Sequence, residues 1–319
     1  MLQKFYNRKT NILALTGDSI SEIEDKEFKN IPKSRINKYS DTNGYIFNSY
    51  YRYKDRPNLK DFVSKIQDYT FGPNFNYELY PGNLPDCILY LTFGSAYNQK
   101  ICFNTLPKNL ISLTFGHSYN QELRDKVLPE SLNSITFGKC YNQQIRPRVL
   151  PDRLISLKFG DDFNQIILEN SLPDNLKELI FGYEFNQNIL KKSLPRNLKI
   201  LTFGHNFNSQ ICSLPTCLTQ LTFGHDYNRT IERDVLPRSL KILYFHGSKN
   251  NSNTINTLPE TVEEIALYNL EANVSNLPLF FKKVKVMTNV YEKWDQVLKI
   301  KVPFGCVITD KTGTELNVD

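Results

Sequence analysis

The sequence predicts a mainly β protein, a parallel β-solenoid of about eleven coils with 22 residues in each. Phe-Gly dipeptides recur at a nearly constant step of 22 residues, and only the last step is shorter, at 20. Leu-Pro pairs recur at a similar spacing, and apolar residues follow each proline at the third, sixth and eighth positions. A fixed period of roughly 20 to 30 residues is typical of a solenoid, in which each repeat stacks on the next.

The predicted array covers residues 62–286. The glycines of the dipeptides are Gly72, Gly94, Gly116, Gly138, Gly160, Gly182, Gly204 and Gly224. The apolar spacing continues after the last of these glycines, because Pro278 is followed by Phe281, Val284 and Val286. The solenoid is therefore expected to extend beyond the region in which the dipeptide is intact.

Each coil is predicted to contain one short strand. In the coil that follows Pro107, the apolar residues Leu113 and Phe115 alternate with the polar residues Ser112 and Thr114. A period of two is expected for a strand with one buried face. Since no helical spacing of apolar residues separates one strand from the next, consecutive strands are expected to pair in parallel, about 4.8 Å apart.

The remaining repeated residues are expected to form the corner after the strand. Glycine can take a positive φ without a steric clash, which suits a tight turn, and the aromatic residue three positions later is expected to form a second buried column. An asparagine follows each aromatic residue, and its amide could satisfy backbone groups of the corner from the inside. The predicted asparagine ladder consists of Asn76, Asn98, Asn120, Asn142, Asn164, Asn186, Asn208 and Asn228.

The two ends of the array are predicted to carry caps. A repeat contacts only its neighbours, so the first and last coils each need a covering segment. Residues 1–61 are assigned to an N-terminal cap or adaptor segment, and residues 287–319 to a C-terminal cap. Within the second cap, Trp294 and the apolar residues that follow it are expected to form a hydrophobic plug.

The repeat resembles a known family. The "FG" corner, the "FN" or "YN" pair and the "LPxxLxxLxF" strand together resemble the FNIP repeat, a leucine-rich-repeat-like module of social amoebae and giant viruses. This resemblance implies a leucine-rich-repeat-like solenoid that binds proteins. Some members of the family join the repeats to a kinase domain or to an F-box that recruits a ubiquitin ligase. No kinase motif is present here, and residues 1–61 lack a convincing F-box pattern, so an adaptor with a degenerate F-box is kept as the alternative function.

The predicted function is a non-enzymatic scaffold that binds an unidentified protein partner through the exposed face of its strands. Most exposed strand positions hold serine or threonine, which fit a pleated surface for reasons of strand propensity alone. The later coils place apolar side chains there instead, at Ile180, Ile200, Ile242 and Tyr244. Apolar area on a solvent-facing surface can mark a contact site, so these four residues are the candidate partner-binding residues.

Nucleic acid is an unlikely partner. The formal charge of +6 is concentrated outside the repeats, which sum to about −1 between residues 61 and 279. A surface that binds a duplex usually needs a basic stripe, and the repeats supply none. The segment "YYRYKDR" at Tyr51, where aromatic and basic residues alternate, is the best candidate for binding single strands, but a solvated loop or cap explains it equally.

No catalytic, cofactor or metal residues are predicted. His205 and His225 occupy equivalent positions in adjacent coils with Asp226 beside them, but a repeat brings like residues together without selection for metal binding. An enzyme on a β-helix, active on polysaccharides, is a lesser alternative. It would need clustered carboxylates, and the adjacent pair Asp161 and Asp162 is explained as well by turn preference.

The remaining expectations concern the setting of the protein. The sequence contains no apolar run long enough to span a membrane and no recognisable signal peptide. Its six cysteines show neither a CxxC pair nor a regular spacing, which favours reduced thiols. A monomer in the cytoplasm, or in the host-cell cytoplasm if the protein is viral, is therefore expected.

Overall fold

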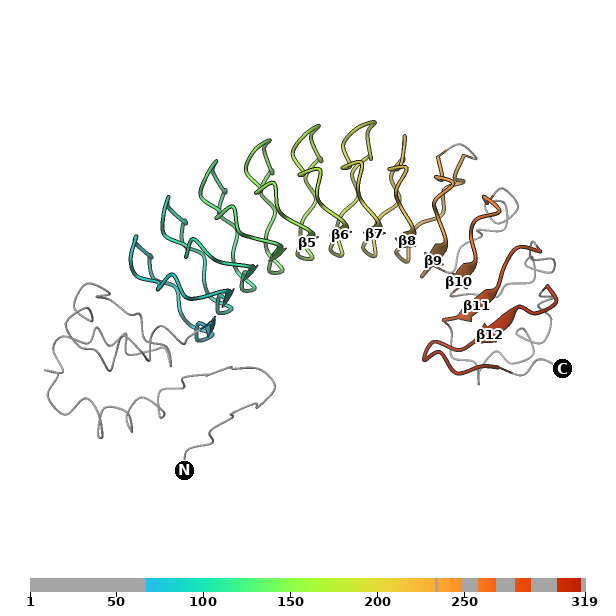
Figure 1. The fold of residues 1–319 in the computed structure, drawn as a ribbon, viewed down its shortest axis with the longest axis horizontal. Coiled ribbons are helices and arrows are strands. Elements are labelled where there is room, and N and C mark those ends of the chain that lie inside the picture. Colours follow the sequence, from blue (N-terminus) through green and yellow to red (C-terminus); the bar gives the residue numbers. More distant parts are fainter. Residues whose placement is uncertain (1–66, 233–234, 248–257, 268–278, 288–302, 317–319) are drawn as a thin grey trace, which may run out of the picture. The chain divides into compact units, whose positions relative to one another are not determined.

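The computed structural model describes residues 67–232, 235–247, 258–267, 279–287 and 303–316. These fall into two compact units, Met1–Ile155 and Ser156–Asp319, and each unit is a stack of parallel coils. The strands lie along one side of the coils and the connecting turns along the other (Figure 1). The predicted N-terminal cap, the "YYRYKDR" segment and Trp294 lie outside the described residues.

The first unit contains four of the predicted strands, and they pair in parallel in the order of the sequence. They are β1 (Asp68–Thr70), β2 (Tyr90–Thr92), β3 (Ser112–Thr114) and β4 (Ser134–Thr136). Each residue pairs with the residue 22 positions further on, as Leu91 does with Leu113. The repeat period of the sequence is therefore the register of the sheet.

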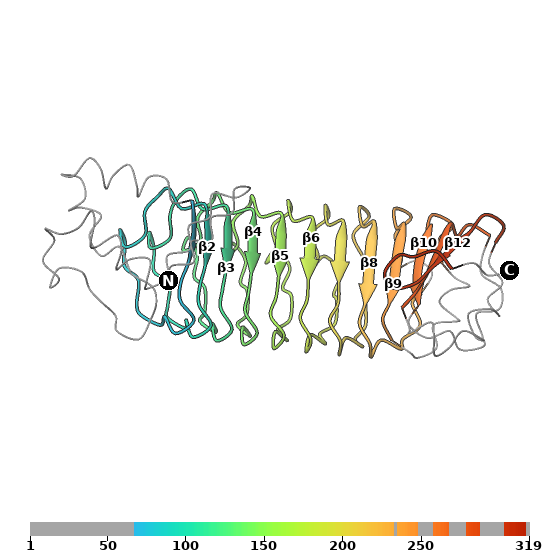
Figure 2. The same ribbon diagram turned by 90° about the horizontal axis from the view of Figure 1, so that it is seen from below.

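The second unit continues the same arrangement and again keeps the order of the sequence. Its strands are β5 (Ser156–Lys158), β6 (Glu178–Ile180), β7 (Ile200–Thr202), β8 (Gln220–Phe223), β9 (Ile242–Phe245), β10 (Glu264–Leu267), β11 (Lys283–Val286) and β12 (Val307–Thr309). Figure 2 shows several of them side by side. Strand β12 pairs in parallel with β11, so strand pairing extends into residues 287–319. The predicted parallel β-solenoid of leucine-rich-repeat type is confirmed.

In the described residues, the proline of each Leu-Pro pair begins a tight turn that leads into the strand. The carbonyl of Pro107 accepts a hydrogen bond from the N–H of Leu110 at 3.2 Å, and the carbonyl of Pro195 does the same for Leu198. Proline suits this position because its ring fixes φ and it has no N–H to leave unpaired. The leucine three positions later is fully buried, as Leu110 and Leu198 both are, so the turn delivers the chain directly into the core.

The core consists of stacked columns of leucine, isoleucine and aromatic residues. Phe115 and Tyr119, one at each side of a corner, are buried and stack with their ring centroids 3.9 Å apart. Phe115 also stacks on Phe93 and Phe137 of the neighbouring coils, at 5.7 and 5.3 Å. Aromatic pairs of this kind contribute about 0.5–1.5 kcal/mol each beyond the burial of their area. The predicted second column is therefore present, and it contacts the first.

The corner glycines are required for a reason other than the predicted one. None of the eight repeat glycines from Gly72 to Gly224 has a positive φ, although Gly305, after Phe304 near the C-terminus, does. A Cβ atom built on Gly204 would instead stand 1.7 Å from the carbonyl oxygen of Gly182, and one on Gly116 would stand 1.8 Å from that of Gly94. The glycines are needed because the backbones of adjacent coils approach each other too closely here for any side chain.

Positive φ occurs at a different turn, on the opposite side of the coil from the glycine corner. The residues that adopt it there are Gly82, Asn104, Lys126, Arg148, Asn170 and Lys192, which follow one another at steps of 22. Only the first of these is glycine. Side chains at the other five are accommodated because they point away from the stack and are exposed, although the left-handed conformation is disfavoured for them.

The asparagine ladder is present, but it lies at the side of the coils and not inside them. In each unit the Oδ1 atom of one asparagine accepts a hydrogen bond from the backbone N–H of the asparagine in the next coil. These bonds join Asn76 to Asn98, Asn98 to Asn120 and Asn120 to Asn142, and then Asn164 to Asn186, Asn186 to Asn208 and Asn208 to Asn228, at 2.8–3.2 Å. All eight side chains are half-buried or exposed, because the aromatic residue before each asparagine takes the interior and the next side chain points outward.

Replacing Gly204 with alanine is expected to lower the free energy of unfolding by more than about 4 kcal/mol, since the new methyl group must displace backbone and not a side chain. Thr202→Ala, on the half-buried outer face of the same coil, is the control and should cost less than about 1 kcal/mol. Chemical denaturation followed by circular dichroism measures both. Equal stability of the two variants would contradict the close approach.

Asn164→Leu is expected to destabilise by about 1–3 kcal/mol, because Oδ1 of Asn164 accepts from both the N–H of Asn186 at 2.9 Å and Nε2 of Gln187 at 3.0 Å. Asn164→Asp retains an acceptor oxygen at the same place and should recover most of the loss. A melting temperature unchanged in Asn164→Leu would show that the ladder contributes nothing to stability.

Tyr119→Phe is expected to leave stability at neutral pH unchanged or to raise it by up to about 1 kcal/mol. The hydroxyl of Tyr119 is buried and has no hydrogen-bond partner among the described residues, and the second unit accommodates Phe163 and Phe185 in the same column.

The same variant tests the pH dependence of stability. Burial raises the pKa of Tyr119, so the folded state resists the ionisation that the unfolded chain undergoes above about pH 10. The free energy of unfolding should therefore fall as the pH rises past this value. The decrease should be smaller in Tyr119→Phe, which lacks the ionisable hydroxyl. A parallel loss in both proteins would show that this hydroxyl is not the group responsible.

Candidate functional site

The outer face of the strands in the second unit is the candidate site. The middle residue of each strand points into the core, as the fully buried Leu179 and Leu201 show. The flanking residues therefore point outward, and among them are all four predicted partner-binding residues. This alternation follows from the two-residue period of the strand, so the sheet itself fixes their direction.

Ile180, Ile200, Ile242 and Tyr244 are all half-buried on this face. Ile200 and Ile242 lie in one column, with Gln220 of β8 between them. Ile180 and Tyr244 lie in the other column, with Thr202 and Thr222 between them. The structure thus places the four side chains on one face, with Ile180 and Ile200 on adjacent strands and β8 separating this pair from the other.

Tyr244 is held by polar contacts that the sequence analysis did not foresee. Its hydroxyl donates a hydrogen bond to Oε1 of Glu264 on β10 at 2.6 Å, and Nζ of Lys283 on β11 lies 3.6 Å from the same oxygen. Burial and the hydrogen bond to Glu264 together raise the pKa of the Tyr244 hydroxyl. Tyr244 is therefore an anchored ring, and only its body is available to a partner.

Two residues that flank the core positions of their strands are nevertheless buried. Thr222 is 5% exposed, and Ala266 is not exposed at all. Both are register neighbours of Tyr244, on β8 and β10. The ring of Tyr244 lies between these two short side chains and shields both from solvent, which the alternation of buried and exposed residues along a strand does not predict.

A second group of exposed apolar side chains lies outside the strands, in the segments that lead from a ladder asparagine into the next turn. Ile166, Leu168 and Leu190 are 46%, 39% and 48% exposed. The positions equivalent to Leu168 in the first unit hold Tyr80, Cys102, Arg124 and Arg146. The sequence predicts an outward direction only for the strand positions, through their period of two, so it did not single out these residues.

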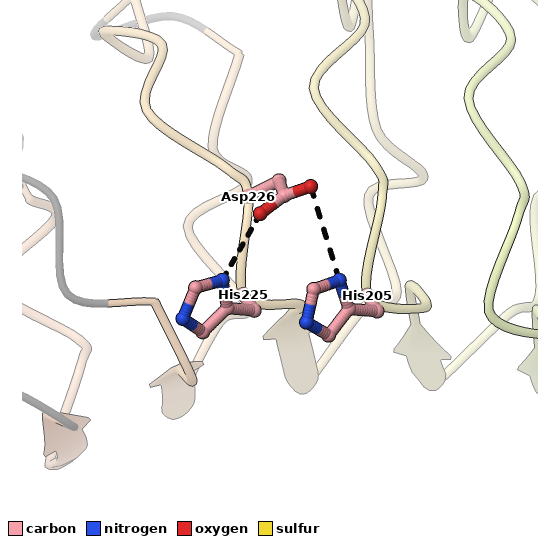
Figure 3. Close-up of side chains that lie close together, drawn as sticks. All are labelled: His205, His225 and Asp226. Carbon is pink, nitrogen blue, oxygen red and sulfur yellow. Dashed lines mark hydrogen bonds and ion pairs between the residues drawn. The ribbon is translucent and has the colours of Figure 1, made fainter.

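The glycine corner of the second unit carries a stack of three rings. Tyr183 lies 4.4 Å from His205, and His205 lies 4.7 Å from His225, measured between ring centroids, with interplanar angles of 13° and 12°. The carboxylate of Asp226 reaches both imidazoles: Oδ1 is 3.0 Å from Nδ1 of His225, and Oδ2 is 3.8 Å from Nδ1 of His205 (Figure 3). The neighbours expected from the sequence are thus in contact.

Within the part of the chain that the structure describes, His205, His225 and Asp226 are the one group of three or more potential metal ligands. Asp161 and Asp162, considered for the enzyme alternative, have no third acidic or histidine residue grouped with them in those same segments. No helix in the described segments is long and apolar enough to span a membrane.

Comparisons with known proteins agree with the fold. A solved structure reported as "The crystal structure of CroV588 a novel circular LRR protein structure" is 35% identical, with a TM-score of 0.64 over 77% of this chain. This chain spans only 40% of the length of that one. YopM from Yersinia enterocolitica WA-314 is 16% identical with a TM-score of 0.34, over 75% of this chain and 64% of YopM, which is too distant to inform the fold. No curated protein matches.

The model of the family described as "FNIP Repeat" matches residues 97–140, 141–184, 185–226, 210–248 and 227–269. Together these segments cover more than half of the chain. The "FG" corner, the aromatic-asparagine pair and the proline turn all lie within them. The chain therefore belongs to the FNIP repeat family, as a repeat solenoid of leucine-rich-repeat type, an architecture typical of protein-interaction scaffolds.

Proposed function

We propose that this protein is a non-enzymatic scaffold that binds another protein through the outer strand face of its second unit. The observation that carries the proposal is the pair of isoleucines, Ile180 and Ile200, on the solvent side of adjacent strands. The equivalent positions in the first unit hold mainly serine and threonine. Apolar side chains in place of polar ones lower the cost of desolvating this face when a partner covers it.

The charged residues around the isoleucines indicate the chemistry of the partner. Glu178 accepts a hydrogen bond from Ser156 at 2.7 Å, and Glu264 is engaged by Tyr244 and Lys283, so both carboxylates already have partners and only the charge of Glu264 is offset by a cation. Lys158 on β5 is exposed, and Lys285 on β11 is half-buried. A partner that combines apolar side chains with acidic groups fits this face best.

Rigidity favours the strand face over the apolar turns at Leu168 and Leu190. The strand positions are fixed by backbone pairing on both sides, as Ile200 is by its neighbours on β6 and β8. A partner that docks there does not have to order the chain first, which reduces the entropic cost of binding.

The alternative function, a substrate-recognition adaptor of a ubiquitin ligase, depends on residues 1–61. These residues lie outside the described part of the chain. The adaptor proposal uses the same strand face to hold the substrate, so a search for partners tests both functions. Recovery of Skp1 and a cullin together with the partner would favour the adaptor.

The test is affinity capture with the full chain, followed by measurement of the dissociation constant for each purified protein that is recovered. Ile200→Asp is expected to weaken binding at least tenfold, which corresponds to about 1.4 kcal/mol, because it buries a charge in the apolar contact. Ser112→Asp, at the equivalent position of the first unit, and Leu190→Asp, in the turns, are the matched controls and should bind like the native chain.

Circular dichroism confirms that each variant is folded before its affinity is compared. Native affinity in a folded Ile200→Asp variant would exclude the strand face, and a loss of binding only in Leu190→Asp would move the site to the turns. Failure to recover any saturable protein partner would contradict the scaffold function itself.

A further inference from the structure

We propose that His205, His225 and Asp226 bind a divalent transition-metal ion such as Zn²⁺ at the glycine corner of the second unit. The two imidazoles and the carboxylate each offer one ligand atom, and these three atoms lie within 4.8 Å of one another. Imidazole nitrogen with carboxylate oxygen is a common ligand set for zinc, whereas Ca²⁺ and Mg²⁺ prefer oxygen alone.

The distances suit a single ion. Two ligands at about 2.1 Å from a tetrahedral zinc ion stand roughly 3.4 Å apart. Oδ1 of Asp226 lies 3.0 Å from Nδ1 of His225 and Oδ2 lies 3.8 Å from Nδ1 of His205, so the imidazoles face different oxygens of one carboxylate at separations on either side of this value. Both Nδ1 atoms face the carboxylate of Asp226 (Figure 3), so a bound ion would replace the contact of His225 with Asp226 and the contact of His205 with Oδ1 of Asn206.

The fold holds the three ligands in place before the ion arrives. The backbone N–H of Asp226 donates to the carbonyl of His205 at 2.9 Å, which joins the two coils at the site itself. Tyr183 stacks on His205 from the other side and limits the rotation of that ring. Ligands held in this way lose little conformational entropy when they bind, so the affinity gained per ligand is larger than on a flexible loop.

The surroundings also favour a cation. Asn206 places its Oδ1 atom 3.0 Å from Nδ1 of His205, and its amide donates to Glu184 at 2.6 Å, so a second carboxylate lies next to the site. The side chains of His205, His225 and Asp226 are 36%, 45% and 47% exposed, which gives the ion direct access from solvent. With three protein ligands, one position of a tetrahedral ion stays open to water or to a group from a bound partner.

The first unit supplies an internal comparison. His117 occupies the same position of the repeat, but its counterparts in the adjacent coils are Ser95 and Lys139. A single imidazole beside a lysine cannot bind a cation comparably. Repetition alone therefore does not make a metal site, and it is the combination of two histidines with Asp226 that does.

Isothermal titration of the full chain with Zn²⁺ at pH 7 is expected to show one saturable site with a dissociation constant on the order of micromolar, and weaker binding at pH 5, where protons compete for the imidazoles. His225→Ala and Asp226→Asn should each weaken the affinity at least tenfold, while His117→Ala should leave it unchanged. Zn²⁺ binding that persists at native affinity in the folded double variant His205→Ala/His225→Ala would overturn the proposal.

A spectroscopic measurement identifies the ligands directly. The chain has four histidines, so their ring protons are few enough to follow by NMR during a titration with Co²⁺. The signals of His205 and His225 should broaden or shift first, at less than one equivalent, and that of His117 should not. Uniform effects on all four rings, or none, would contradict a specific site.

Discussion

The close approach of adjacent coils at the glycine corner is the constraint on which the rest of the structure depends. With no Cβ atom at Gly182 or Gly204, the backbone of one coil contacts that of the next, as the carbonyl of Gly182 shows. Every residue then stands beside its equivalent in the neighbouring coils. The parallel strand pairs, the aromatic columns and the asparagine ladder all follow from this alignment, because each requires equivalent positions of adjacent coils to lie in register.

This alignment also decides where function can lie. Positions that are the same in every coil are used for stacking, so only the positions that vary are available for recognition. A change in a single coil has little effect, but similar changes in adjacent coils produce a continuous surface. Ile180 and Ile200 on the strand face are one such combination. Tyr183, His205 and His225 at the corner are another, and there the 20-residue coil still brings its histidine into the stack.

The sequence predicted the register of the strands, the buried columns and the asparagine ladder, because spacing alone carries this information in a repeat. Two of the physical reasons expected from the sequence were wrong. The corner glycines do not adopt positive φ, and the asparagines do not point inward. Both errors arose because the coil was considered singly, whereas Gly204 is required by the coil before it and Asn164 acts on the coil after it. The burial of Thr222 beside Tyr244 has the same origin, a contact between neighbours.

The sequence by itself therefore determined the parallel solenoid, its 22-residue register and its membership of the FNIP repeat family, since each depends on the order and spacing of residues along the chain. Only the tertiary structure decided which side chains meet across the coils and at what distance. The hydrogen bond from Tyr244 to Glu264 and the placement of Asp226 between His205 and His225 depend on side-chain direction. That direction is fixed by the packing of one coil against the next, which no single repeat contains.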